Sequence, residues 1–223
     1  MPSGGYRSIG DLPTVIPVFP LDGAILLPSG ALPLQIFEPR YLNMVDDAMS
    51  GHRLIGMVQT GPGGDRARPG LARVGCVGRI TSYSETGDGK YLITLTGICR
   101  FRVGEELSAM TPYRQVRADF SAFHEDLEPQ DDDLEFERVP FLAALRRYLD
   151  VRGLGVDWEA VNAAPGPALI NSLCMALPFD TGEKQALLEA ASIEDRRTAL
   201  SALLEIGAAQ SSQTDDDAPP SLQ

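Results

Sequence analysis

Residues 31–49 read ALPLQIFEPRYLNMVDDAM, and this stretch passes from a strand to a helix without a linker. Leu32, Leu34 and Ile36 alternate with other residues at the period of two that is typical of a half-buried strand. Pro39 cannot donate a hydrogen bond to a strand ladder, but its fixed φ suits the first turn of a helix. The sequence therefore predicts a sheet-to-helix corner at this proline.

The helix after the corner is predicted from its apolar period. An apolar stripe is formed by Tyr41, Met44, Val45, Ala48 and Met49, whereas Asn43, Asp46 and Asp47 face water. Glu38 is expected to cap the free N–H groups of the first turn and to suit the positive end of the helix dipole. A corner of this kind holds its side chains rigidly at the end of a sheet. The candidate site is Phe37, Glu38, Arg40 and Tyr41.

Two roles are open for these corner residues. Glu38 and Arg40 either pair and fix the corner, or flank a groove in which the two aromatic side chains contact a peptide. A buried aromatic side chain contributes ~1.5–3 kcal/mol, so a structural role alone accounts for Phe37 and Tyr41. We prefer the structural role, because the proline and the helix cap already supply it.

The composition is that of a globular protein. The chain has 223 residues, 43% of them hydrophobic and 22% charged, which is enough for one large domain or two small ones. No run approaches the ~20 apolar residues of a membrane helix, and the first residues lack the apolar segment of a signal peptide. Cys76, Cys99 and Cys174 are widely spaced without a CxxC motif, which predicts free thiols and a cytoplasmic protein.

The net charge of −12 is unevenly distributed. Residues 1–120 carry 12 basic and 11 acidic side chains, whereas residues 121–223 carry 7 basic and 20 acidic ones. Nucleic-acid binding depends on clustered Lys and Arg, so this distribution argues against a nucleic-acid partner.

The first half of the chain is predicted to be mainly β. Strands are expected at residues 15–19 (edge-like, because of Pro17), 53–59, 74–83, 90–103 and 113–120, with a hairpin turn at 84–89. Bulges or bends that close a small barrel are expected at Gly75, Gly78 and Gly97. Residues 61–70 are predicted to form a mobile surface loop, and the arginines there and just after it (Arg66, Arg68 and Arg73) are an alternative contact surface.

The second half is predicted to be helical. Helices are expected at residues 134–149, 157–163, 167–176, 180–188 and 192–206, and capping boxes at Asp180/Glu183 and Ser192/Asp195. Eight carboxylates between 125 and 137 predict a solvated linker rather than a metal site. The predicted organisation is α+β, with a flexible arm at 1–12, a β-rich domain at 13–122, a helical subdomain at 123–207 and a disordered acidic tail at 208–223.

No catalytic or metal-binding arrangement is predicted, and no cofactor. The two lysines, Lys90 and Lys184, are expected beside a turn and in the first turn of a helix that faces solvent, which argues strongly against a Ser–Lys dyad. His52 and His124 are expected to be exposed, and the cysteines to be buried as small hydrophobes rather than zinc ligands. A phosphate-binding G-x-x-x-x-G-K-[ST] motif is absent from the sequence.

Residues 17–49 resemble the opening of the Lon protease N-terminal domain, the substrate-recognition region of that family. The most specific match is FEPRY at 37–41, followed by VGRI at 77–80, GICRF at 97–101, LPF at 177–179 and EKQALLE at 183–189. Together the matches cover residues 13–206. The resemblance implies a β-rich PUA-like pseudo-barrel followed by an α-helical bundle.

The resemblance also implies a function. It suggests a stand-alone, non-catalytic member of this peptidase S16-like family, without the ATPase and peptidase regions. Such a protein would bind unfolded or partner protein segments, as an adaptor or regulator in protein quality control. Binding is expected through an apolar groove between barrel and bundle and an exposed strand edge. The alternative is a PUA-like protein that binds a small ligand or RNA, and the oligomeric state is open.

Overall fold

The computed structural model describes residues 5–65, 67–128 and 136–214, and it has the mixed α+β fold that the sequence predicts. The chain forms two compact units. The first combines Met1–Gln130 with Asn171–Glu189, and the second combines Asp131–Ile170 with Ala190–Gln223. The observed units are thus discontinuous in sequence, whereas a single division after residue 122 was expected.

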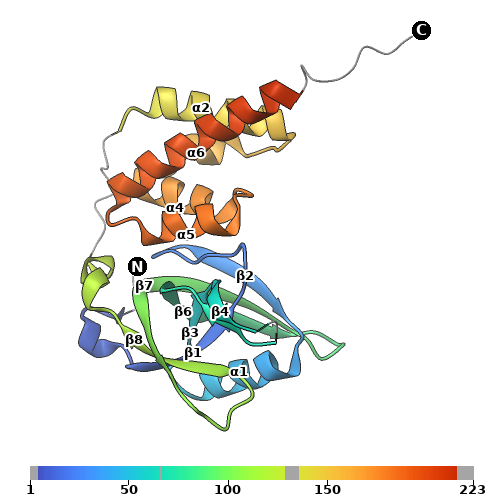
Figure 1. Ribbon diagram of the computed structural model, residues 1–223, viewed down its shortest axis with the longest axis vertical. Coiled ribbons are helices and arrows are strands. Elements are labelled where there is room, and N and C mark those ends of the chain that lie inside the picture. Colours follow the sequence, from blue (N-terminus) through green and yellow to red (C-terminus); the bar gives the residue numbers. More distant parts are fainter. Residues whose placement is uncertain (1–4, 66, 129–135, 215–223) are drawn as a thin grey trace. The chain divides into compact units, whose positions relative to one another are not determined.

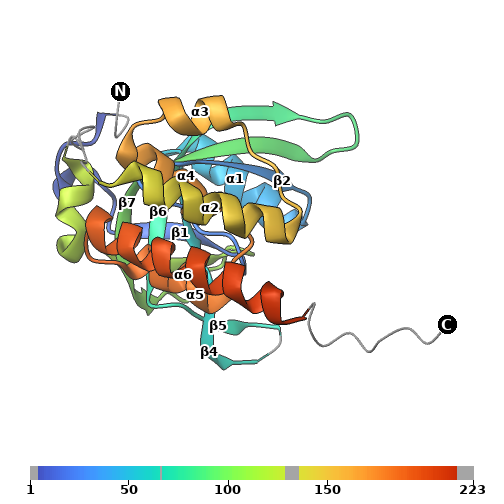
Figure 2. The same cartoon turned by 90° about the horizontal axis from the view of Figure 1, so that it is seen from above.

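The first unit contains a closed barrel of strands (Figure 1). Its strands, in spatial order, are β7 (Tyr91–Glu106), β6 (Val74–Glu85), β3 (Leu54–Val58), β1 (Val15–Pro20) and β8 (Arg114–Asp119), and β8 pairs again with β7. Strand β2 (Ala31–Ile36) pairs with the first part of β7. The β6–β7 hairpin projects beyond the barrel (Figures 1 and 2).

Closure depends on a bulge in the long strand β7. The register steps from Val77 opposite Cys99 to Gly78 opposite Gly97, so Ile98 has no partner residue in β6. A Cβ on Gly97 would lie 2.0 Å from the Leu27 carbonyl oxygen, which only glycine avoids. The predicted bulge is confirmed at Gly78 and Gly97.

The third glycine expected at a bulge has another role. No register shift occurs at Gly75. A Cβ there would lie 2.5 Å from Cγ1 of Val58 and 2.9 Å from the ring of Phe101, so the glycine makes room for core side chains.

Two predictions for the strands are wrong. Strand β1 is not an edge, because it pairs with β8 on one side and with β3 on the other. Pro17 is tolerated because the pairing with β3 begins only at Val18. The expected loop at 61–70 forms a two-stranded ribbon of β4 (Thr60–Gly64) and β5 (Pro69–Leu71), and Arg66 lies outside the described residues.

The barrel core includes part of the predicted flexible arm. Leu12 is buried in a cluster with residues of the barrel strands and of the 3-10 helix η3 (Ser121–Leu127), and Tyr6 packs against it. A 3-10 turn, η2 (Ile9–Asp11), precedes Leu12, and the Asp11 carboxylate accepts hydrogen bonds from two backbone N–H groups. The arm is therefore part of the folded unit from Tyr6 onward, while residues 1–4 lie outside the description.

The helices follow the predicted periods. They are α1 (Pro39–Ser50), α2 (Arg138–Arg152), α3 (Trp158–Ala163), α4 (Gly166–Ala176), α5 (Thr181–Glu189) and α6 (Ile193–Thr214). Both predicted capping boxes form reciprocal hydrogen bonds, and the side chain of Asp157 caps α3. Helix α6 passes the predicted end at Ile206 and extends into the predicted tail, whose residues 215–223 are outside the description.

In the second unit, α2 and α6 lie side by side (Figures 1 and 2). Leu145 and Tyr148 of α2 and Leu200 and Leu204 of α6 are fully buried. A Cβ on Gly207 would lie 2.5 Å from the Tyr148 ring, so the glycine permits close approach of the helices.

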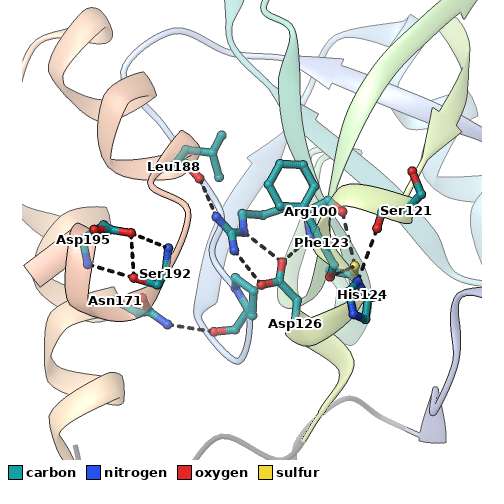
Figure 3. A network of polar contacts seen from close by, with 11 residues as sticks. Arg100, Ser121, Phe123, His124, Asp126, Asn171, Leu188, Ser192 and Asp195 are labelled. Atoms are coloured by element: carbon teal, nitrogen blue, oxygen red, sulfur yellow. Dashed lines mark hydrogen bonds and ion pairs between the residues drawn. The ribbon is translucent and has the colours of Figure 1, made fainter.

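A buried ion pair ties α5 to the barrel (Figure 3). The Asp126 carboxylate accepts hydrogen bonds from the backbone N–H of Arg100 at 2.8 Å, from its Nε at 2.9 Å and from its Nη2 at 2.8 Å. Nη1 of Arg100 donates to the Leu188 carbonyl oxygen at 3.2 Å, and its guanidinium stacks 4.5 Å from the Phe123 ring centre. The prediction of a solvated linker is therefore wrong for Asp126, because this carboxylate faces a buried guanidinium; residues 129–135 are outside the description.

Hydrogen bonds of two buried side-chain amides also hold α5 and the second part of α4 in place. Nε2 of Gln59 donates to the Thr181 carbonyl oxygen at 2.9 Å and to the side chain of Gln185 at 3.0 Å. Nδ2 of Asn171 donates to the Pro28 carbonyl oxygen at 3.2 Å. These bonds explain why residues 171–189 belong to the β-rich unit.

We predict that Asp126→Asn lowers the free energy of unfolding by about 3 kcal/mol, because the substitution leaves a buried guanidinium without its counter-charge. Urea denaturation followed by circular dichroism measures the change. The control is Glu105→Gln, which breaks an exposed pair with Arg117 at 3.5 Å and should cost less than about 1 kcal/mol. Equal effects of the two substitutions would contradict the structural role of the buried pair.

Candidate functional site

The FEPRY segment lies at the predicted corner. Strand β2 ends at Ile36, and Pro39 is the first residue of α1. The backbone N–H groups of Tyr41 and Leu42 donate to the Glu38 carbonyl oxygen at 2.9 and 3.0 Å, which starts the helix directly after the strand. The sheet-to-helix junction is thus confirmed.

The polar side chains of the corner bind each other. The Glu38 carboxylate accepts hydrogen bonds from Nε of Arg40 at 3.0 Å and is 2.8 Å from its Nη2. It makes no hydrogen bond to the backbone of the helix, so the predicted cap is wrong. The guanidinium two residues away competes for the carboxylate as a charged donor, and a short Asp or Ser side chain would suit the cap better.

The two aromatic side chains of the corner have different environments. Tyr41 is buried, its ring centre lies 4.2 Å from that of Phe19, and the Arg40 guanidinium lies over the Tyr41 ring at 4.6 Å from its centre. Phe37 is 62% exposed. The structural role therefore accounts for Tyr41 but not for Phe37.

A pocket of about 520 Å³ opens beside Arg40 and Tyr41. Its walls come from β1, the start of α1, the β4–β5 ribbon, and the β7–β8 connection with the first residue of β8. The lining residues are Pro20, Arg40, Tyr41, Thr60, Ala67, Arg68, Pro69, Leu107, Ser108, Ala109, Thr111, Pro112, Tyr113 and Arg114.

Ion pairs fix two of the pocket arginines. Arg114 forms a two-point pair with Glu106, at 2.8 and 2.6 Å, and its Nη1 donates to the Pro69 carbonyl oxygen at 2.7 Å. Arg68 also pairs with Glu106. Hydrogen bonds from Arg114 first, and then from Arg68, lower the pKa of Glu106, so this carboxylate holds both guanidiniums in place.

Sequence reasoning found only part of this pocket. Arg68 belongs to the predicted contact surface, but Arg73 does not line the pocket. Tyr113 and Arg114 were missed because nothing local to the start of β8 indicates that it faces α1. Tyr113 donates to Asp47 at 2.7 Å, and burial, together with this bond, raises the pKa of Tyr113 to about 12.

A second, shallower surface lies on the sheet beside the corner. A hollow of about 480 Å³ is lined by Pro33, Leu34, Gln35, Ser82, Ser84, Leu92, Ile93 and Thr94, from β2, β6 and β7. Leu92 is 45% exposed. Within the described residues, β2 pairs with β7 alone and is the end strand of its sheet.

Comparison with known proteins assigns the family. A sequence model of the ATP-dependent protease La (LON) substrate-binding domain matches residues 15–205. The chain belongs to the Lon substrate-binding domain family.

Curated relatives agree with this family. Lon protease 2 of Myxococcus xanthus is 27% identical over 194 residues, which are 83% of this chain and 23% of that protein. The Lon protease of Dictyoglomus thermophilum is 32% identical over 199 residues, which are 83% of this chain and 24% of that protein. This Lon substrate-binding domain thus spans about a quarter of the length of these relatives.

Solved structures show the same fold. A Lon N-terminal domain protein from Xanthomonas campestris has a TM-score of 0.60 and 24% identity, covering 85% of this chain and 98% of that chain. The N-terminal domain of a Mycobacterium avium complex Lon protease has a TM-score of 0.56 and 17% identity, covering 87% and 98%.

Among the described residues of this Lon substrate-binding domain, no group of three metal-ligating side chains is found. Cys76 and Cys99 are free and buried, as predicted, and burial raises the pKa of Cys76 well above its usual value and that of Cys99 to about 12. His52 and His124 are exposed, as expected. None of the helices in the described parts of the chain has the length and apolar character to cross a membrane.

The two lysines were candidates for a Ser–Lys dyad. Lys90 pairs with Asp88 at 2.6 Å beside the hairpin turn. Lys184 was expected to face solvent, but it is 5% exposed and its Nζ donates to the Met175 carbonyl oxygen at 2.9 Å. Burial lowers the pKa of Lys184. The expectation of exposure failed because α5 packs in the β-rich unit.

We predict that all three thiols of the folded chain are unreactive toward Ellman's reagent at about pH 8, because burial disfavours the thiolate. After denaturation in guanidinium chloride, three thiols per chain should react. Absorbance of the released thionitrobenzoate measures both values, and rapid labelling of the native chain would contradict the burial of these cysteines.

Proposed function

We propose that this chain is a non-catalytic module that binds extended segments of other proteins at the free edge of β2. The observation that carries the proposal is the combination of an end strand with exposed apolar side chains, in a family whose model is named for substrate binding. An extended segment can add to such an edge through its backbone, while pockets beside the edge contact alternate side chains.

The side chains near β2 suit an apolar segment. Phe37 at the end of the strand is 62% exposed, and Leu92 on the neighbouring strand is 45% exposed. Leu32 and Leu34 are half-buried along the strand itself. Exposed aromatic and aliphatic side chains beside an unpaired edge otherwise favour aggregation, so their presence at this edge supports a binding role.

The proposal includes the absence of catalysis. Lys184 contacts a backbone carbonyl oxygen, Lys90 contacts a carboxylate, and the sequence has no phosphate-binding loop. In the cell, the same proposal corresponds to a role as adaptor or regulator in protein quality control. The free cysteines fit the reducing cytoplasm.

Incubation of the pure protein with casein, with and without ATP, should give no fragments. The appearance of fragments would overturn the proposed absence of peptidase activity.

We predict that Phe37→Ser weakens binding of an unfolded protein about tenfold, because an exposed aromatic side chain is a common hot spot. Fluorescence anisotropy of labelled, reduced and alkylated α-lactalbumin measures the dissociation constant. The matched control is Val139→Ser, which removes an apolar side chain 82% exposed on α2 and should leave binding unchanged.

A second comparison tests the backbone contacts. An extended apolar peptide should bind, and the same peptide with N-methyl groups at alternate residues should lose binding in one of its two methylation patterns, since one edge of a strand faces β2. Equal binding of all forms would contradict strand addition. Failure of the wild-type chain to bind any of these probes at micromolar concentrations would contradict the proposed function itself.

A further inference from the structure

Among the described residues, the lining of the pocket beside Arg40 and Tyr41 includes hydrogen-bond donors and no acidic side chain. Its charged lining residues are Arg40, Arg68 and Arg114. The neighbouring carboxylates, of Asp22, Glu38, Asp47 and Glu106, accept hydrogen bonds from lining residues but are not themselves part of the lining.

Two of these guanidiniums have N–H groups without a hydrogen-bond partner among the described residues. Arg40 uses Nε and Nη2 for Glu38, and Arg68 uses Nη2 for Glu106. Within the described parts of the chain, Nη1 of Arg40 and both Nε and Nη1 of Arg68 make no hydrogen bond. A planar guanidinium with free N–H groups is suited to bind a carboxylate or a phosphate.

Tyr41 adds a third donor from within the wall. Its side chain is only 6% exposed, its ring is held by Phe19, and its hydroxyl makes no hydrogen bond to any residue in the described part of the chain. The hydroxyl is therefore available to donate to an acceptor bound in the pocket. The hydroxyl of Tyr113, by contrast, is already bonded to Asp47.

The rest of the lining combines the hydroxyl side chains of Thr60, Ser108 and Thr111 with apolar side chains. Leu107, Pro69 and the tyrosine rings face the same space as the guanidiniums. A volume of about 520 Å³ accommodates a ligand of small-molecule size rather than a long segment. An apolar wall next to donors for an anion matches a chain end, where an apolar side chain and a carboxylate belong to one residue.

We propose that this pocket binds the C-terminal carboxylate of a peptide that ends in an apolar residue. The carboxylate contacts the free N–H groups of Arg40 and Arg68 and the Tyr41 hydroxyl, and the last side chain packs against the apolar wall. The pocket shares no residue with the hollow beside β2, so this inference does not rest on the proposed strand addition.

The test is fluorescence anisotropy with a labelled hexapeptide that ends in two leucines, in the free-acid and the amidated form, on the full chain. The acid should saturate below about 1 mM and the amide should bind at least about tenfold more weakly, since the amide removes the charged acceptor. Equal binding of the two forms, or no saturation with the acid, would overturn the proposal without any substitution in the protein.

Substitutions then locate the binding. Tyr41→Phe, which keeps the ring packing, and Arg40→Gln should each weaken the acid about five- to tenfold. Arg117→Gln removes an exposed guanidinium of the barrel outside the pocket and should have no effect. Unchanged affinity in both pocket variants would overturn the assignment of the site.

Competitors distinguish the source of the anion. An amidated peptide with an internal Glu beside leucine should compete poorly, and so should inorganic phosphate and oligouridylate. Stronger competition by the peptide with an internal Glu would mean that the pocket binds an acidic side chain, and would overturn the assignment to a chain end. Stronger competition by phosphate or oligouridylate would overturn the peptide ligand in favour of a phosphate-bearing one.

Discussion

The ion pair between Arg100 and Asp126 determines which segments form the β-rich unit. The guanidinium uses one end for the carboxylate of η3 and the other for the carbonyl oxygen of Leu188 at the end of α5. Burying an unpaired charge is expensive, so the ion pair holds η3 against the barrel, and the hydrogen bond to Leu188 adds a contact with α5. After η3 the chain contributes to the second unit, and it returns to the β-rich unit within α4, at Asn171, and remains there to the end of α5.

The barrel in turn fixes the FEPRY corner. Strand β2 is paired to β7, and Tyr41 is packed on Phe19 of β1, so both sides of Pro39 are held by different strands. This leaves Phe37 exposed on one side, while Arg40 and Tyr41 line a pocket. One short segment thus serves the two surfaces that the proposals concern, and its polar pair, Glu38 with Arg40, orients one of the pocket's guanidiniums.

Predictions succeeded where the physical cause lies within a few residues. The capping boxes of α5 and α6 and the bulge at Gly97 were recognised from local spacing, and the family was recognised from FEPRY and the later matches. Two of the failed predictions concern residues whose partners are distant in sequence, whereas the expected Glu38 cap failed because of the nearby Arg40. Pro17 suggested an edge, but a strand's neighbours are set by closure of the barrel; Lys184 was expected on the surface, but docking of α5 buries it.

The sequence by itself determined the elements and the corner, because periodicity, proline's fixed φ and helix caps act between neighbouring residues. Only the tertiary structure decided the unit boundaries and the pocket. Asp126 is 26 residues from Arg100, and Leu188 is 88 residues from it. Arg114 lines the same pocket as Arg40 and Tyr41 because the barrel closes. No pattern along the chain encodes contacts over such separations.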